Sequence, residues 1–343
     1  MPPSVYPTGV TIYHPEKCWP GYTLIPSSAR STAKGAQLID MNGHSIRRWE
    51  GVFGCFDNKL LPGGDILGSS GLTPGHHFHD MKDLIQVNWD HQTVWCFDRG
   101  DQVEVDGTPI WSARAHHDFQ RQGNPVGYFA PDQLPLHRGL TLFNSTKIVD
   151  RPDIAPVPLA DTRLIAIDPD GDVLWEWLLT DHWEELGLRP GARNAYYLNP
   201  GYRPQIGYAK DVFLNNCAWL GPNKWYEAGD SRFHPDNIIT DIRILNSSLI
   251  ISHETGDIVW KLGPYYDNTP TLEQLGLIIG QHQVHMIPTG LPGAGNILLF
   301  DNGGEAGYGD PNPNALDGRL DGRRGYSRVL ELDPITLARL SYL

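Results

Sequence analysis

The amino-acid sequence predicts an all-β protein with the architecture of a β-propeller. Gly and Pro are abundant among its 343 residues, with 37 and 28 copies, and 11 Trp and 14 Tyr accompany them. This composition is typical of many short strands joined by tight turns. In addition, one hairpin-like unit recurs along the chain, and repeated small sheets are the sequence signature of a propeller.

Each copy of the repeat consists of an apolar strand, a turn rich in Asp, Asn or Gly, and a second strand that ends in Trp. The turn residues favour the positive φ angles and the side chain–backbone hydrogen bonds that tight hairpins need. Four clear copies and a degenerate fifth occupy residues 38–49, 84–95, 164–175, 249–260 and 329–334. Their uneven spacing predicts long loops between strands, the longest over residues 178–235.

The chain ends and the domain organisation follow from the same pattern. Residues 9–13 (Gly-Val-Thr-Ile-Tyr) have the composition of a strand, and we expect this strand to pair with the C-terminal hairpin and close the ring. No linker-like segment divides the sequence, so residues 1–343 are expected to form a single β-propeller domain.

The charge of the chain argues against several classes of partner. The net charge is −13 and no run of Lys or Arg occurs, so neither nucleic acid nor an anionic membrane is an expected partner. No apolar stretch reaches the roughly 20 residues of a membrane span. The first residues lack the basic and apolar regions of a signal peptide, which predicts a cytoplasmic location. The oligomeric state cannot be read from the sequence.

Eight of the 14 His residues fall in four short clusters, each before or within a predicted strand. The clusters occupy residues 76–79, 116–117, 234 and 282–285. In a propeller the innermost strands line a central channel, so residues distant in the sequence can converge there. A single His is most often a hydrogen-bonded structural residue. Four clusters instead favour a functional site, because burying several imidazoles costs hydration unless they bind a ligand or react.

Two kinds of chemistry use such a group of histidines. A neutral imidazole can attack an electrophile while neighbouring Arg, His or Asn side chains stabilise the developing negative charge. Alternatively, three or four imidazoles can bind a divalent transition metal, with Asp or Gln side chains fixing their tautomers. The residue types alone do not separate these two chemistries.

Several motifs point to a known family. They include residues 255–263 (Thr-Gly-Asp-Ile-Val-Trp-Lys-Leu-Gly) and the Gln281-His282 pair, which is followed by residues 296–303 (Asn-Ile-Leu-Leu-Phe-Asp-Asn-Gly). With residues 9–13, residues 21–24 and the Asp-x-Asn-Gly…Trp hairpins, most of the chain resembles the bacterial arylsulfotransferase family. These enzymes transfer a sulfuryl group between phenols without a nucleotide cofactor. The resemblance implies a six-bladed β-propeller that needs no cofactor.

The resemblance also implies roles for four residues. His282 corresponds to the nucleophile, which would take the sulfuryl group covalently. His117 and Arg243 match a channel His and an Arg that hold the sulfuryl oxygens, and Asn215 matches an assisting Asn. The expected reaction is therefore transfer of a sulfuryl group from an aryl sulfate to a phenolic acceptor, with a small aromatic or sulfated molecule as substrate.

A histidine-ligated metal enzyme is the alternative hypothesis. The family's His is missing from the segment before Asn215, whereas several other histidines stand next to acidic residues. The candidate ligands are His79, His117, His234, His282 and His285, with Asp80, Asp118 and Asp236 as orienting neighbours. Such a site would hold a divalent transition metal and act as a lyase, hydrolase or oxygenase on a small aromatic substrate. A non-catalytic scaffold for protein binding is a third alternative, which no feature of the sequence favours.

Overall fold

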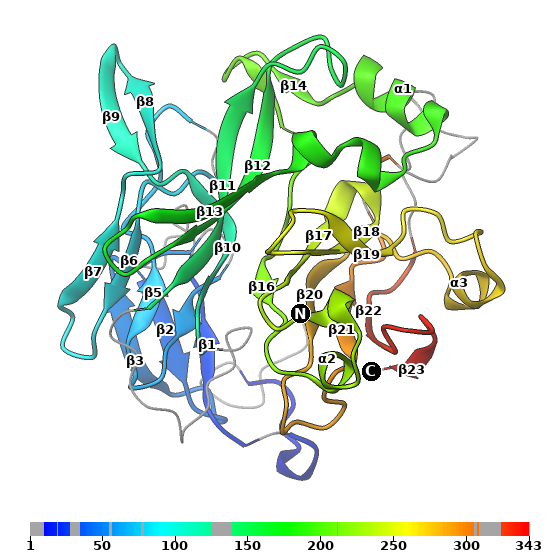
Figure 1. The fold of residues 1–343 in the computed structure, drawn as a ribbon. Helices are drawn as coiled ribbons and strands as arrows, with labels where there is room; N and C mark the ends of the chain where they lie inside the picture. Colours follow the sequence, from blue (N-terminus) through cyan, green and yellow to red (C-terminus); the bar gives the residue numbers. More distant parts are fainter. Residues whose placement is uncertain are drawn as a thin grey trace. The chain divides into compact units, whose positions relative to one another are not determined.

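The computed structural model describes residues 10–18, 20–27, 35–54, 57–76, 79–124, 139–210, 212–304, 307–308 and 324–342. Strands dominate this part of the chain, and its helices are short (Figure 1). The chain separates into two compact units. Unit 1 comprises Met1–His117 and Gly127–Gly139, and unit 2 comprises Asp118–Val126 and Leu140–Leu343.

Unit 1 contains two antiparallel sheets in which strands consecutive in sequence lie side by side. Sheet I consists of β1 (Thr23–Ile25), β2 (Gly35–Ile39) and β3 (Ser45–Glu50). Sheet II consists of β4 (Lys59–Leu60), β5 (Ile66–Gly68), β6 (Leu84–Val87) and β7 (Thr93–Phe97). A separate hairpin is formed by β8 (Asp101–Val105) and β9 (Thr108–Ser112). Sheets I and II share an apolar cluster that includes Trp49 and Ile66, both fully buried.

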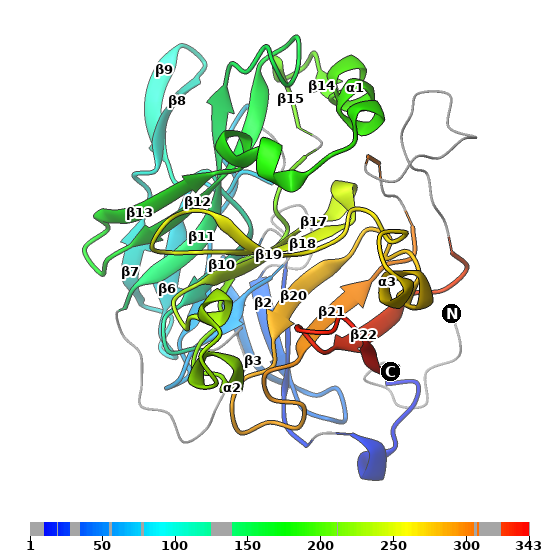
Figure 2. The same cartoon turned by 45° about the vertical axis from the view of Figure 1, so that its right-hand side comes forward.

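Unit 2 contains three further sheets; most of their strands are labelled in Figure 2, and β16 and β23 are labelled in Figure 1. Sheet III consists of β10 (Ala115–Arg121, which begins in unit 1), β11 (Thr141–Val149), β12 (Leu159–Ile167) and β13 (Val173–Leu178), extended by β14 (Tyr202–Arg203) and β15 (Tyr208–Ala209). Sheet IV consists of β16 (Ala218–Trp219), β17 (Ile238–Ile242), β18 (Ser247–Ile251) and β19 (Ile258–Leu262). Sheet V consists of β20 (His282–Met286), β21 (Ile297–Asp301), β22 (Arg328–Leu332) and β23 (Arg339–Tyr342).

Short helices lie between the strands. The α-helices are α1 (Pro190–Leu198), α2 (Lys224–Glu227) and α3 (Pro270–Leu275). The 3₁₀ turns are η1 (Pro15–Lys17), η3 (Leu179–His182), η4 (Glu184–Leu186), η5 (Ser231–Phe233) and η6 (Arg243–Leu245). None of the described helices is long and apolar enough to span a membrane.

The four full repeats of the sequence correspond to the hairpins β2–β3, β6–β7, β12–β13 and β18–β19, and the degenerate fifth corresponds to β22 and the start of the turn to β23. The turn between two such strands is held by its first polar side chain. In sheet I, Asp40 Oδ1 accepts hydrogen bonds from the backbone N–H groups of Asn42 (2.9 Å) and His44 (2.8 Å). Asn88, Asp168 and Asp333 hold their turns in the same way. The Asp or Asn of the motif therefore satisfies backbone donors that the hairpin leaves unpaired.

These blade-type sheets confirm the all-β, propeller-like arrangement, but they correct the expected number of blades. The described residues form five sheets of three or more strands, one for each repeat, whereas the family resemblance implied six. The expected closing strand is not found either. Residues 10–13 form no strand, Ile12 is 75% exposed, and sheet V is built from β20–β23 alone. Gly9 lies outside the described residues.

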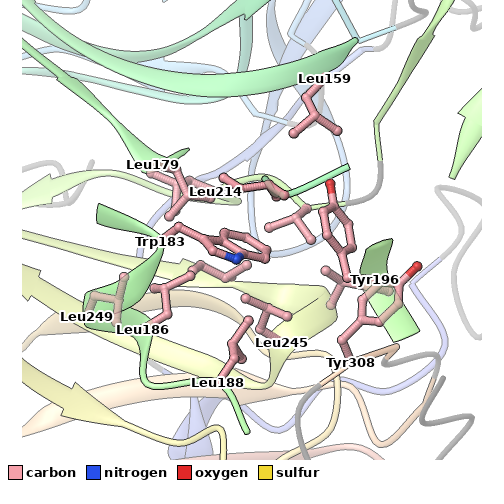
Figure 3. Packing of buried hydrophobic residues seen from close by; sticks show 14 of the residues in the cluster. Leu159, Leu179, Trp183, Leu186, Leu188, Tyr196, Leu214, Leu245, Leu249 and Tyr308 are labelled. Atoms are coloured by element: carbon pink, nitrogen blue, oxygen red, sulfur yellow. The ribbon is translucent and has the colours of Figure 1, made fainter. Parts of the chain in front are cut away.

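A buried apolar cluster of unit 2 packs residues of its strands against α1 and the 3₁₀ turns η3 and η4 (Figure 3). Trp183 packs against Tyr196 of α1 with ring centroids 5.1 Å apart, and Tyr196 meets Tyr308 edge-on at 5.0 Å. Leu214 and Leu245 belong to the same cluster and are fully buried. Leu214 immediately precedes Asn215, and Leu245 ends the 3₁₀ turn that begins with Arg243. The apolar core therefore fixes the backbone on which two of the expected site residues stand.

Side chains of sheet III bind the backbone of sheet IV, in an arrangement that we call the first seam. Asp118 Oδ2 accepts a hydrogen bond from the Cys217 N–H (3.0 Å), and Gln120 Oε1 accepts one from the Trp219 N–H (2.8 Å). Both acceptor side chains are buried. The first seam thus provides side-chain acceptors for two backbone N–H groups where sheet IV begins.

Candidate functional site

The expected site residues are divided between the two units. His79 and His117 belong to unit 1, whereas Asn215, Arg243 and His282 belong to unit 2. His234 and His285, which the metal hypothesis adds, also belong to unit 2.

Three histidines of unit 1, His79, His116 and His117, form a buried group. His117 contacts His79 edge-on, with ring centroids 4.8 Å apart, and His116 Nδ1 lies 2.8 Å from His117 Nδ1. One of these two nitrogens must carry the proton that the other accepts. A buried ion pair between Arg114 and Asp80 (2.8 Å) fixes the adjoining segments. His77, another member of the expected cluster, lies outside the described residues.

The backbone beside this group is unusual. His117 has φ 57° and Arg114 has φ 48°, in the left-handed region that residues other than Gly rarely adopt. Such conformations persist only where surrounding contacts hold them, and they concentrate at functional sites. The backbone at His117 is therefore held by its surroundings in a conformation that is rare for a residue other than Gly.

In unit 2, His282 is the first residue of β20 and its ring has a defined tautomer. Nδ1 lies 3.0 Å from the Gly280 carbonyl oxygen and 3.1 Å from Asn302 Oδ1. Both atoms are acceptors, so Nδ1 carries the proton and donates it. The lone pair consequently resides on Nε2, which is the nucleophilic and basic atom of the ring.

The surroundings keep His282 uncharged. Burial lowers the pKa of this half-buried imidazole, and the positive charge of Arg243 lowers the pKa further. Both effects outweigh the two hydrogen bonds at Nδ1, which favour the protonated form. His282 is therefore neutral at neutral pH, as a nucleophile or general base must be.

Arg243 and Asn215 lie at the same end of β17. Arg243 directly follows this strand. The Asn215 N–H donates a hydrogen bond to the carbonyl oxygen of Asp241 (3.0 Å), and the adjacent Leu214 forms a β-bridge with Ile242. Asn215 is only 6% exposed, yet within the described part of the chain neither polar atom of its side chain has a hydrogen-bond partner. A buried amide in this state points to a ligand or a water as its partner.

Asp241, near the end of β17, is a second buried polar residue with an unpaired side-chain atom in the described part of the chain. It is fully buried, and its Oδ1 likewise has no hydrogen-bond partner among the described residues. Burial raises the pKa of Asp241 well above its ordinary value, and the charge of Asp118 raises the pKa further. Both effects favour the protonated, uncharged form of the Asp241 carboxyl group.

Two side chains of sheet IV bind the backbone of sheet V, which we call the second seam. Asp241 Oδ2 accepts a hydrogen bond from the Val284 N–H (3.3 Å), and Asn216 Nδ2 donates one to the Val284 carbonyl oxygen (2.7 Å). On the other side of His282, Gln281 Nε2 donates to the Ser247 carbonyl oxygen (2.7 Å). The segment that carries His282 is thus tied to sheet IV before and after the histidine.

His234 does not join this group. It follows η5 on the loop before β17, has a side chain that is 42% exposed, and meets Tyr226 edge-on at a centroid distance of 4.7 Å. The strand β17 separates it from Arg243, and a strand of this length spans roughly 13 Å. Its place on a surface loop, beside an aromatic ring, is that of a structural residue.

The metal hypothesis finds no cluster to support it in the described residues. There, no group of three or more His, Cys, Asp or Glu side chains is placed to hold a metal ion together. His285 Nδ1 lies 2.9 Å from the Gln283 carbonyl oxygen, so this side chain is hydrogen-bonded within its own strand.

Two residues of the site are absent from the sequence-based prediction. Asp241 carries a signal that was available, because a charged residue interrupts an otherwise apolar strand, Ile-Ile-Thr-Asp-Ile. Asn302 lies in the Asp-Asn-Gly motif that follows β21, but its contact with His282 depends on the pairing of β20 with β21. Spacing alone does not reveal that contact.

Comparisons with known proteins identify no family. No protein-family model matches the sequence, and a search of curated proteins finds no match. Among solved structures, the chain is similar to a protein of unknown function from Bacteroides caccae, with 8% identity and a TM-score of 0.43 over 95% of this chain and 73% of that one. It is also similar to the dihydro-heme d1 dehydrogenase NirN in complex with DHE, with 11% identity and a TM-score of 0.32 over 94% of this chain and 55% of that one.

Proposed function

We propose that this protein is a sulfuryl-transfer enzyme in which His282 accepts the sulfuryl group of an aryl sulfate and passes it to a phenol. One observation carries the proposal: His282 donates from Nδ1 to two acceptors and keeps the lone pair on Nε2, while burial and the charge of Arg243 lower its pKa. This combination is what an imidazole nucleophile that attacks an anionic ester requires.

Arg243 and Asn215 provide for the negative charge of the substrate. The three sulfuryl oxygens carry the charge of the sulfate ester, and their surroundings must remain favourable while the S–O bond breaks. The guanidinium of Arg243 supplies positive charge, and the Asn215 amide supplies a buried N–H donor. Such preorganised donors lower the barrier without moving during the reaction. The family resemblance adds His117, whose role in oxygen binding remains a prediction because this residue lies in unit 1.

The reaction proceeds by two displacements at sulfur. His282 Nε2 attacks the sulfur atom, an N–S bond forms, and the S–O bond to the aryl group breaks. The phenolate leaves with the electron pair and takes a proton from water. In the second step the oxygen of the acceptor phenol attacks sulfur, the N–S bond breaks and its electron pair returns to Nε2. Nε2 then takes the proton of the acceptor phenol and releases it to solvent, which regenerates the neutral imidazole.

The test is an assay with p-nitrophenyl sulfate as donor and phenol as acceptor. We expect a burst of nitrophenol, turnover that depends on the acceptor, and a sulfuryl adduct on the peptide that contains His282. His282→Ala should abolish the burst and the adduct, whereas the matched control His234→Ala should keep both. Turnover of His282→Ala at the wild-type rate would refute the proposal.

A further inference from the structure

The backbone of β20 departs from a regular strand directly after His282. His282 pairs with Phe300 and His285 pairs with Leu298, so β20 uses three steps where β21 uses two. The extra residue lies within a β-bulge, and Gln283 has φ 55°. A bulge changes the direction of neighbouring side chains, and positive φ at a residue other than Gly needs contacts that hold it.

The contacts that hold this bulge come from sheet IV and meet at one residue. Val284 follows Gln283, and both backbone polar groups of Val284 are bound by the second seam. The two partners, Asp241 and Asn216, are fully buried, so neither can be replaced by solvent. With the N–H and the carbonyl group of Val284 both fixed, its peptide planes cannot rotate, and the preceding Gln283 stays in the left-handed region.

We propose that Asp241 and Asn216 are positioning residues for His282, because they clamp Val284 and thereby fix the bulge that aims the imidazole. The proposed role of His282 as nucleophile is the basis for this inference. If the clamp opens, β20 can return to regular pairing, which turns the ring away from Gly280 and Asn302. His282 then loses the two acceptors that place the proton on Nδ1.

The charge state of Asp241 sharpens the expectation. Burial raises the pKa of this carboxyl group and so favours its neutral form, which can still accept the Val284 N–H through a carbonyl oxygen. Asn has nearly the same shape, is neutral and offers the same acceptor, so Asp241→Asn should preserve the clamp. Asp241→Leu has similar volume but removes the acceptor, and Asn216→Ala removes the donor on the other side. A carboxylate acting through its charge would give the opposite result, with Asp241→Asn as damaging as Asp241→Leu.

The experiment measures the tautomer of His282 and the kinetics of the same variants. Long-range ¹H–¹⁵N spectra of histidine-labelled protein report which ring nitrogen carries the proton, and His282→Gln assigns the signals. We expect the Nδ1–H form in the wild type and in Asp241→Asn. In Asp241→Leu and Asn216→Ala we expect the Nε2–H form that free imidazole side chains prefer, with kcat reduced about 100-fold and KM little changed.

Two control variants separate positioning from general damage. Asp161→Leu removes a buried carboxyl group of sheet III that accepts hydrogen bonds from Thr180, and Asn58→Ala removes a buried amide of unit 1 that donates to Leu67. Both should lower stability and leave the His282 tautomer unchanged. If Asp241→Leu does not fold, Asn216→Ala decides.

The outcomes also separate this inference from the proposed function. An unchanged Nδ1–H tautomer and wild-type kcat in folded Asp241→Leu or Asn216→Ala would overturn the positioning role while sulfuryl transfer stands. If the wild type does not turn over aryl sulfates, the proposed function fails, and the tautomer measurement still decides whether the clamp aims His282.

Discussion

The buried carboxyl group of Asp161 makes the stability of unit 2 depend on pH in a way that a single substitution removes. Asp161 lies on β12, is 3% exposed, and accepts hydrogen bonds from the backbone N–H of Thr180 (3.1 Å) and from its hydroxyl group (2.6 Å). Burial raises the pKa of Asp161 from its ordinary 3.8 to about 7, because the two hydrogen bonds offset only part of the cost of burying the charge. Asp161→Asn keeps an oxygen acceptor for Thr180 and cannot ionise.

The size of the effect follows from this difference in pKa. At low pH the carboxyl group is protonated in the folded and the unfolded chain, so it contributes no pH dependence. As the pH rises past 3.8 the unfolded chain loses the proton and the folded protein keeps it, so the free energy of unfolding falls until about pH 7. Each pKa unit corresponds to about 1.4 kcal/mol, so the loss amounts to about 4 kcal/mol. Asp161→Asn should therefore be the more stable protein at pH 8 by up to this amount.

Urea unfolding followed by Trp fluorescence, at intervals from about pH 4 to pH 8, measures this difference. We expect the gap between Asp161→Asn and the wild type to widen with pH and to level off above the pKa of Asp161. The control is Asp153→Asn, since Asp153 is exposed and its pKa is lowered by its hydrogen bond and ion pair with Arg151. Above the ordinary pKa of Asp, Asp153→Asn should be slightly less stable than the wild type, because it loses the ion pair with Arg151. A gap between Asp161→Asn and the wild type that is constant with pH would refute the reasoning.

Three other predictions concern the site and the backbone. Removing the charge of Arg243 by Arg243→Gln should raise the pKa of His282, so the acid limb of the pH–rate profile moves to higher pH, and kcat should fall about 100-fold. In the wild type, the rate should fall on acidification with a midpoint below the ordinary pKa of His, because protonation removes the Nε2 lone pair. A midpoint above that value would contradict the assignment of His282 as the nucleophile. Gly263→Ala should destabilise the protein by about 2 kcal/mol or more in urea unfolding, because Gly263 has φ 82° and an added Cβ would lie 2.2 Å from the Asn246 carbonyl oxygen. Gly191→Ala in α1, where a Cβ meets nothing within 4 Å, should instead be neutral or stabilising by about 0.5 kcal/mol.

The hairpins of the fold were predictable because their turns are specified locally. Asp40 and Asp168 bind backbone groups two and four residues ahead, so the signal and the structure it specifies occupy the same short segment. The number of blades was wrong where it was taken from the family resemblance, although the repeats themselves gave five. The expected strand at residues 9–13 failed for a related reason, because strand composition does not provide a partner strand.

The site was predictable only in part, since its geometry depends on contacts between sheets. The sequence motifs predicted His282 and Arg243 as site residues, and the charge of Arg243 contributes to the lowered pKa of His282. The role of Asp241 was not visible, because it depends on Val284, which lies 43 residues further along the chain. His234 was included for its residue type, yet the loop that carries it ends on the surface beside Tyr226.

The two seams of unit 2 distinguish buried polar residues that join neighbouring sheets from those that do not. Asp118, Gln120, Asn216 and Asp241 each satisfy a backbone group of the neighbouring sheet. Replacing any of them by an apolar residue leaves a buried backbone group of the neighbouring sheet without its hydrogen-bond partner, and this weakens the contact between the two sheets. Asn215 and Arg243 form no part of either seam as defined above, so substitutions there should leave the hydrogen bonds of both seams in place. Under the proposed function, changes in substrate preference should therefore arise at these two positions, with the seam residues retained.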